Sequence, residues 1–164
     1  MVASAFDKEF IQETPDGLRV YHVDGGQVRS LTDVEFALGG HSLVKPYIPS
    51  GEVWIERMAD PKDEQANLHH ELWEYRLMRD KHLPYEEAHR QASLAETGER
   101  ILAQLGEGLR YNGPWMDGER FIGHTFTDVG ATGTTFVCDD LEDCKARLVR
   151  KREEFGQTGH WQKM

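Results

Sequence analysis

The feature that most constrains the fold is a long segment, residues 62–80, that contains neither glycine nor proline and is rich in Leu, Glu, Arg, Met and His. The pair Asp60-Pro61 precedes it, as an N-cap and a first-turn proline commonly precede a helix. His82-Leu83-Pro84 interrupts the pattern, and residues 85–105 then predict a second helix. Because the connection is so short, we expect the two helices to form an antiparallel hairpin.

Short runs rich in β-branched and aromatic residues lie on both sides of these helices. Before them we expect strands of a small antiparallel sheet: a β-hairpin over residues 18–31 that turns at Asp24-Gly25-Gly26, and further strands at 32–38, 42–48 and 52–56. After them, residues 118–127 and 134–138 predict a second β-hairpin, and residues 139–155 a final helix.

Strands and helices therefore cluster along the chain rather than alternate, which indicates an α+β fold. A chain of 164 residues is long enough for one domain with its own core. We expect a single domain over residues 1–164, with mainly strands at 18–56, the helical hairpin at 61–105, and a hairpin plus helix at 118–155.

Composition narrows the classes of partner. The chain has 19 Lys and Arg against 29 Asp and Glu, a net charge of -10, which disfavours nucleic acid as the main partner. No stretch approaches the roughly 20 apolar residues of a membrane span, and the first ten residues do not form a signal peptide. We expect a cytoplasmic protein that does not bind membranes. Its two cysteines, Cys138 and Cys144, are expected to be reduced thiols.

The chemically informative segment is His70-Glu71-Leu72-Trp73-Glu74, an H-E-x-x-E motif within the first predicted helix. His70 and Glu74 are one helical turn apart, so both side chains can point at one ion, whereas Glu71 is rotated by about 100° and lies beside them. The motif resembles the H-E-x-x-H of zinc metalloproteases, with glutamate at the second ligand position.

The second predicted helix supplies a third ligand. At a rise of about 1.5 Å per residue, His89 and Glu74 lie at the same level of an antiparallel hairpin. His70, Glu74 and His89 then provide two imidazoles and one carboxylate, a ligand set used by hydrolytic zinc sites that leave the fourth position to water. The preceding strand, residues 51–56, is a candidate for presenting an extended substrate.

A wider set of residues carries a resemblance to a known family. Gly39-Gly40-His41, the segments 49–55 and 70–78, residues 85–89 and Glu96 together resemble a family of small proteins encoded by phages and mobile elements, which is similar to minimal zincin-type metalloproteases. The likeness covers residues 20–96. It implies a metal-dependent hydrolase that acts on a peptide or protein.

These observations give one hypothesis for the mechanism. His70, Glu74 and His89 bind Zn²⁺, and Glu71 is the general base that takes a proton from the metal-activated water. Tyr85 and His41 are candidate donors to the oxyanion, placed by neighbourhood and by the resemblance.

Non-catalytic alternatives remain open. His70 can be a core histidine bonded to Glu74 or to a backbone carbonyl, and the chain a phage-associated structural or interaction protein. In that case the His/Glu cluster is a buried polar group or a closed metal site completed by Glu96 or His41. A di-iron site is disfavoured because a second E-x-x-H is missing, and Gly130-Ala131-Thr132-Gly133 lacks the lysine of a phosphate-binding loop.

Overall fold

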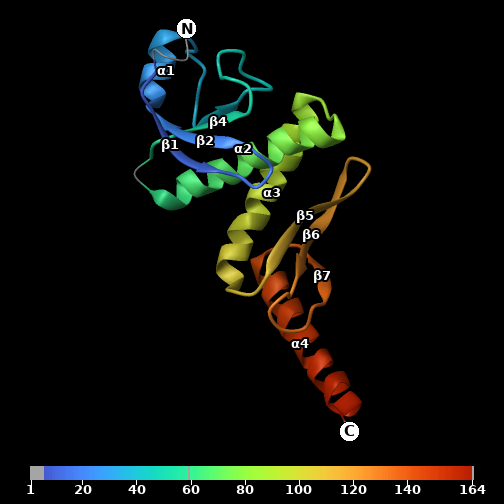
Figure 1. The fold of residues 1–164 in the computed structure, drawn as a ribbon. Coiled ribbons are helices and arrows are strands. Elements are labelled where there is room, and N and C mark those ends of the chain that lie inside the picture. The colour runs from blue at the N-terminus through green and yellow to red at the C-terminus, as the bar shows by residue number, and fades with distance from the viewer. Residues whose placement is uncertain (1–5, 59, 164) are drawn as a thin grey trace. The chain divides into compact units, whose positions relative to one another are not determined.

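The computed structural model describes residues 6–58 and 60–163, and its contacts divide the chain into two compact units, residues 1–93 and 94–164. Each unit contains its own sheet, so the fold is α+β as expected (Figure 1). That residues 1–164 form a single domain stays a prediction.

The first unit is built on a four-stranded sheet of order β1-β2-β4-β3. Its strands are β1 (Lys8–Glu13), β2 (Arg19–Val23), β3 (Gly39–His41) and β4 (Glu52–Glu56). The sheet that was expected to be antiparallel is mixed: β1–β2 and β3–β4 pair antiparallel, whereas β2 pairs with β4 in parallel. A parallel pair needs a long crossover, which the residues between the two strands provide.

That crossover contains a helix where a turn and a strand were expected. Asp24 caps the N-terminus of helix α1 (Gly25–Leu31), because its carboxylate accepts a hydrogen bond from the backbone N–H of Gln27 at 3.3 Å. Gly25 allows a close approach rather than a turn, because a Cβ there would overlap the carboxyl group of Glu56 as it lies in this structure. The glycine pair therefore does not make a β-hairpin.

The strands expected at 32–38 and 42–48 are also absent from the described structure, which has turns in both segments. Asp33 holds them together, since its Oδ2 accepts hydrogen bonds from Lys45 Nζ and Tyr47 OH, each at 2.8 Å. The backbone groups form turn bonds instead of a strand ladder, such as those from Phe36 N–H to the Asp33 carbonyl and from Ile48 N–H to the Lys45 carbonyl.

Helices α2 (Pro61–Lys81) and α3 (Tyr85–Leu105) match the two predicted helices closely. The Asp60 carboxylate caps α2 by accepting from Lys62 N at 2.9 Å, and the helix ends at His82, which adopts a left-handed conformation. Local signals set these boundaries, which is why the sequence predicts them.

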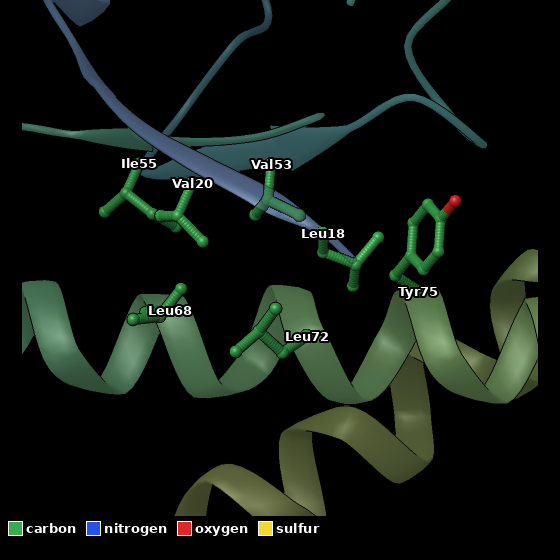
Figure 2. Packing of buried hydrophobic residues seen from close by; sticks show 7 residues of the cluster. All are labelled: Leu18, Val20, Val53, Ile55, Leu68, Leu72 and Tyr75. Carbon is green, nitrogen blue, oxygen red and sulfur yellow. The ribbon is translucent and has the colours of Figure 1, made fainter. Parts of the chain in front are cut away.

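The core of the first unit lies between the sheet and α2. Figure 2 shows apolar side chains of β2, β4 and the residue before β2 facing α2 across this layer, and all members of the cluster are buried: Leu18, Val20, Val53, Ile55, Leu68, Leu72 and Tyr75. Burial of such side chains stabilises the fold by about 1.5–3 kcal/mol each. This packing fixes the face of α2 that carries the His and Glu residues relative to β3 and β4.

The second unit has a three-stranded antiparallel sheet of order β5-β6-β7 and a long helix. Its elements are β5 (Arg110–Asp117), β6 (Arg120–Thr127), β7 (Thr135–Cys138) and α4 (Leu141–Lys163). The β6–β7 hairpin was predicted, whereas β5 was not, because Gly113 and Pro114 suggest a break. Proline fits here because β5 is an edge strand.

The expectation of free thiols is wrong, because Cys138 and Cys144 form a disulfide. Cys138 ends β7 and Cys144 lies in the first turn of α4, which brings their Cα atoms to 4.9 Å. That separation lies within the range of bridged cysteines. The separation of six positions in the sequence did not reveal this approach.

No helix among the described residues is long and apolar enough to cross a membrane. A cytoplasmic location stays a prediction.

Candidate metal centre

The centre of the site is a pair of side chains one turn apart on α2. His70 Nε2 lies 3.2 Å from Oε2 of Glu74, as the i,i+4 spacing predicts. The Glu74 side chain is only 4% exposed and that of His70 only 12%. A carboxylate so deeply buried needs charged or hydrogen-bonding partners.

His89, in the second turn of α3, completes the group. Its Nδ1 lies 2.9 Å from Glu74 Oε2 and 3.2 Å from His70 Nε2, so the predicted juxtaposition of these three residues is confirmed. Half of the His89 side chain is exposed, which leaves that side of the cluster accessible. His70, Glu74 and His89 thus form a group that could hold a metal ion.

The size of this group fits a transition metal. The three atoms form a triangle with edges of 2.9, 3.2 and 3.2 Å. A tetrahedral zinc ion, about 2.0–2.1 Å from each ligand, spaces its ligand atoms about 3.3 Å apart. The triangle needs only a small expansion to reach the spacing of ligands around a zinc ion.

Proton counting also favours a cation in this triangle. If both imidazoles donate to Glu74 Oε2, then His70 Nε2 and His89 Nδ1 each carry a hydrogen. These two N–H groups lie against each other across the 3.2 Å contact between the rings, where neither nitrogen can accept. A metal ion avoids this conflict because it accepts a lone pair from each of the three atoms at once.

A third histidine approaches Glu74 from the sheet. His41, the last residue of β3, is fully buried, and its Nε2 lies 2.8 Å from Glu74 Oε1. The backbone N–H of Leu43 donates to His41 Nδ1 at 3.3 Å, so the neutral ring carries its proton on Nε2 and donates it to Glu74. The two oxygens of Glu74 therefore have different partners: Oε1 faces His41, and Oε2 faces His70 and His89.

This network determines the charge of Glu74. Burial raises the pKa of the carboxyl group, but hydrogen bonds from His41, His70 and His89 outweigh burial and bring the pKa to about 2. Glu74 is therefore an anion at neutral pH, which is the form that binds a metal.

A pocket of about 150 Å³ opens beside the cluster. Its lining includes five of the six predicted site residues, all except His70, together with acidic, basic and small residues: Glu35, Ala37, Gly39, Gly40, His41, Val44, Lys45, Glu71, Glu74, Tyr85 and His89. The glutamate after His70, Glu71, thus shares a pocket with two members of the triangle. A molecule in the pocket would contact the cluster directly.

Glu71 lies near Glu74 and His41. Its carboxylate, that of Glu74 and the His41 ring can each offer an atom within 4.8 Å of the others, which makes a second group of metal-ligating type. Gly39 makes room for Glu71, since a Cβ at residue 39 would lie 3.1 Å from Cγ of Glu71. Gly39 is therefore part of how the site is built.

Tyr85, at the start of α3, lies at the pocket with its ring 5.5 Å from that of His89. Partial burial and the negative charges of Glu74 and Glu71 raise the pKa of its phenol. The hydroxyl therefore keeps its proton at neutral pH and is able to donate a hydrogen bond.

Two sequence-based expectations need correction. The strand β4 is not available to present a substrate, because it lies between β2 and β3 in the sheet and Trp54 is fully buried. The edge strand beside the site is β3 instead. Neither metal-ligating group found among the described residues includes Glu96, which pairs with Arg100 at 3.6 Å.

The sequence did not reveal the contact between His41 and Glu74. The two residues are 33 positions apart, and the contact depends on how β3 packs against α2. The available signal was that His41 follows two glycines and lies within the segments that carry the family resemblance.

Comparisons with protein-family models, with curated proteins and with solved structures found no match to this chain. The relationship to phage-encoded and zincin-like proteins stays a prediction.

Proposed function

We propose that this protein is a zinc-dependent hydrolase that cleaves peptide or amide bonds. The observation that carries the proposal is the triangle of His70, Glu74 and His89. Two of its members, Glu74 and His89, line a pocket together with Glu71 and Tyr85. Three protein ligands with an accessible side are typical of catalytic zinc sites, whereas structural sites have four.

Each residue of the site has one task in this proposal. His70, Glu74 and His89 hold the ion, which when bound polarises a carbonyl group and makes water more acidic. Glu71 accepts a proton from the attacking water and passes it to the nitrogen of the leaving amine.

Tyr85 stabilises the carbonyl oxygen as negative charge develops on it. Its hydroxyl keeps its proton at neutral pH, because burial and the charges of Glu74 and Glu71 raise the phenol pKa. His41 is less suited to this task, because its only N–H is already directed at Glu74.

One observation favours a second, non-enzymatic function. Three histidine nitrogens lie within hydrogen-bond distance of the Glu74 carboxylate, and these contacts can hold it as a buried polar group of the core. In this alternative the chain is a phage-associated structural or interaction protein, and the cluster holds a structural metal or none.

The test compares Glu71→Gln with the unchanged protein, both loaded with one equivalent of Zn²⁺, on a fluorogenic peptide library and on unfolded casein. We expect Glu71→Gln to lower kcat by about 10²–10⁴-fold, because the general base is lost, while zinc content stays the same. The matched control is Glu87→Gln, the same change at a residue that pairs with Arg90 on α3, and it should retain full activity. Turnover by Glu71→Gln at the unchanged rate would refute the proposed base. A zinc-loaded protein without turnover would support the structural alternative.

A further inference from the structure

His41 occupies a position that the proposed mechanism does not use. Its side chain is fully buried, at the end of the edge strand β3, and stands edge-on to the ring of Tyr75 at 5.3 Å. Both of its ring nitrogens have partners: Nδ1 accepts from the Leu43 backbone, and Nε2 contacts Glu74 Oε1 at 2.8 Å. The imidazole is thereby fixed in orientation and tautomer.

The Glu74 carboxylate has one rotational freedom that matters for metal binding. The chemistry proposed above needs a single oxygen, Oε2, to face His70 and His89. A carboxylate that could rotate would offer either oxygen, or neither, at the correct distance. A donor held against Oε1 removes that freedom.

We propose that His41 is a positioning residue, which holds Glu74 Oε1 through its Nε2–H so that Oε2 is directed at the ion. This inference rests on the proposed metal site and assigns His41 a role different from that of an oxyanion donor. Hydrogen bonds from such outer partners commonly strengthen metal binding by about 10–100-fold.

A competing role for His41 is as the ligand of a second ion, together with Glu71 and Glu74. In that arrangement Glu74 would bridge two ions, as carboxylates do in two-metal hydrolases. The hydrogen bond from Leu43 to Nδ1 opposes it, because Nε2 then bears the proton and has no lone pair to give. The geometry thus favours positioning over ligation.

The experiment measures Zn²⁺ affinity by chelator competition and the visible spectrum of the Co²⁺-loaded protein for three variants. His41→Gln keeps an amide N–H near the place of Nε2, whereas His41→Asn is too short to reach Glu74. We expect His41→Gln to bind Zn²⁺ within about threefold of the unchanged protein, and His41→Asn to bind about 10–100-fold more weakly with an altered Co²⁺ spectrum. The control is His124→Asn, which alters an equally buried histidine of the other unit and should change neither readout.

A second measurement does not depend on any variant folding. In ¹⁵N NMR of the unchanged protein loaded with Zn²⁺, His41 should appear as the Nε2–H tautomer with no shift of Nε2 from metal coordination. An Nδ1–H tautomer would overturn the inference.

The outcomes separate this inference from the proposed function. Equal Zn²⁺ affinity of His41→Asn and the unchanged protein would overturn the positioning role alone. If the protein bound two equivalents of Zn²⁺ and the second required His41, the positioning role would also be overturned. His41 would then be a metal ligand. If the unchanged protein bound no Zn²⁺, both the proposed site and this inference would fall.

Discussion

Two buried histidines, one in each unit, show how similar local contacts can have different chemical consequences. His41 lies 2.8 Å from an oxygen of Glu74, and His124 Nδ1 lies 2.8 Å from the hydroxyl of Tyr111. Both imidazoles are almost completely buried. The difference lies in what surrounds the partner oxygen.

Glu74 has a second oxygen, and two further imidazole nitrogens converge on it beside a pocket. Tyr111 has a single oxygen, and burial raises the pKa of its phenol while burial lowers the pKa of His124, so this pair is neutral. Both groups of metal-ligating type found among the described residues belong to residues 1–93. Convergence of several ligand atoms, rather than a buried histidine as such, marks the candidate site.

The largest expected effect is the loss of metal binding when one corner of the triangle is removed. His70→Ala should weaken Zn²⁺ binding by more than about 100-fold, because it deletes a ligand, and loss of an outer partner alone commonly costs about 10–100-fold. Chelator competition measures this affinity. The control is His124→Ala, and a similar loss in that variant would refute the contrast between the two histidines.

The next effect is stabilisation of the unchanged protein by zinc. An ion that binds only the folded state at a free concentration of 100 Kd raises the free energy of unfolding by about 2.7 kcal/mol. Urea denaturation with and without Zn²⁺ should show this increase in the unchanged protein and lose it in His70→Ala. An equal increase in both proteins would place zinc elsewhere on the chain.

A smaller effect is expected at the neutral pair of the second unit. Tyr111→Phe leaves His124 Nδ1 buried without its hydrogen bond and should lower the free energy of unfolding by about 1–3 kcal/mol. Urea denaturation reports the change, and Zn²⁺ affinity should stay constant. A change in Zn²⁺ affinity would couple the second unit to the metal site and contradict the comparison.

The smallest effect concerns pH. Burial lowers the pKa of His124 in the folded state, so protonation favours the unfolded state. The contribution of neutral His124 to the free energy of unfolding is fully present above the pKa of histidine in the unfolded state, about 6.5, and it declines as the pH falls below that value. Urea denaturation between pH 7.5 and 5 should therefore show a shallower loss of stability in His124→Gln than in the unchanged protein. A steeper loss in the variant would have the wrong sign.

The sequence was sufficient for the features that local signals specify. Asp60 and Pro84 delimit α2 and α3, and helical spacing places His70 beside Glu74. The match in level between Glu74 and His89 also followed, because only a three-residue connection separates the helices.

Features that depend on distant contacts could not be predicted in the same way. Gly25 looks like part of a turn until the Glu56 carboxyl is seen against it, and the helix α1 replaces the expected hairpin. The partnership of His41 with Glu74 requires β3 and α2 to be packed together. Such contacts arise from the tertiary fold and leave little trace in residue spacing.

The most direct test of the metal centre is an anomalous difference map, collected at the zinc edge, from crystals of the Zn²⁺-loaded protein. We expect a peak about 2.0–2.2 Å from Nε2 of His70, Nδ1 of His89 and Oε2 of Glu74. Absence of a peak between these three atoms, with the rings and carboxylate still in hydrogen-bonded contact, would contradict the proposed metal centre.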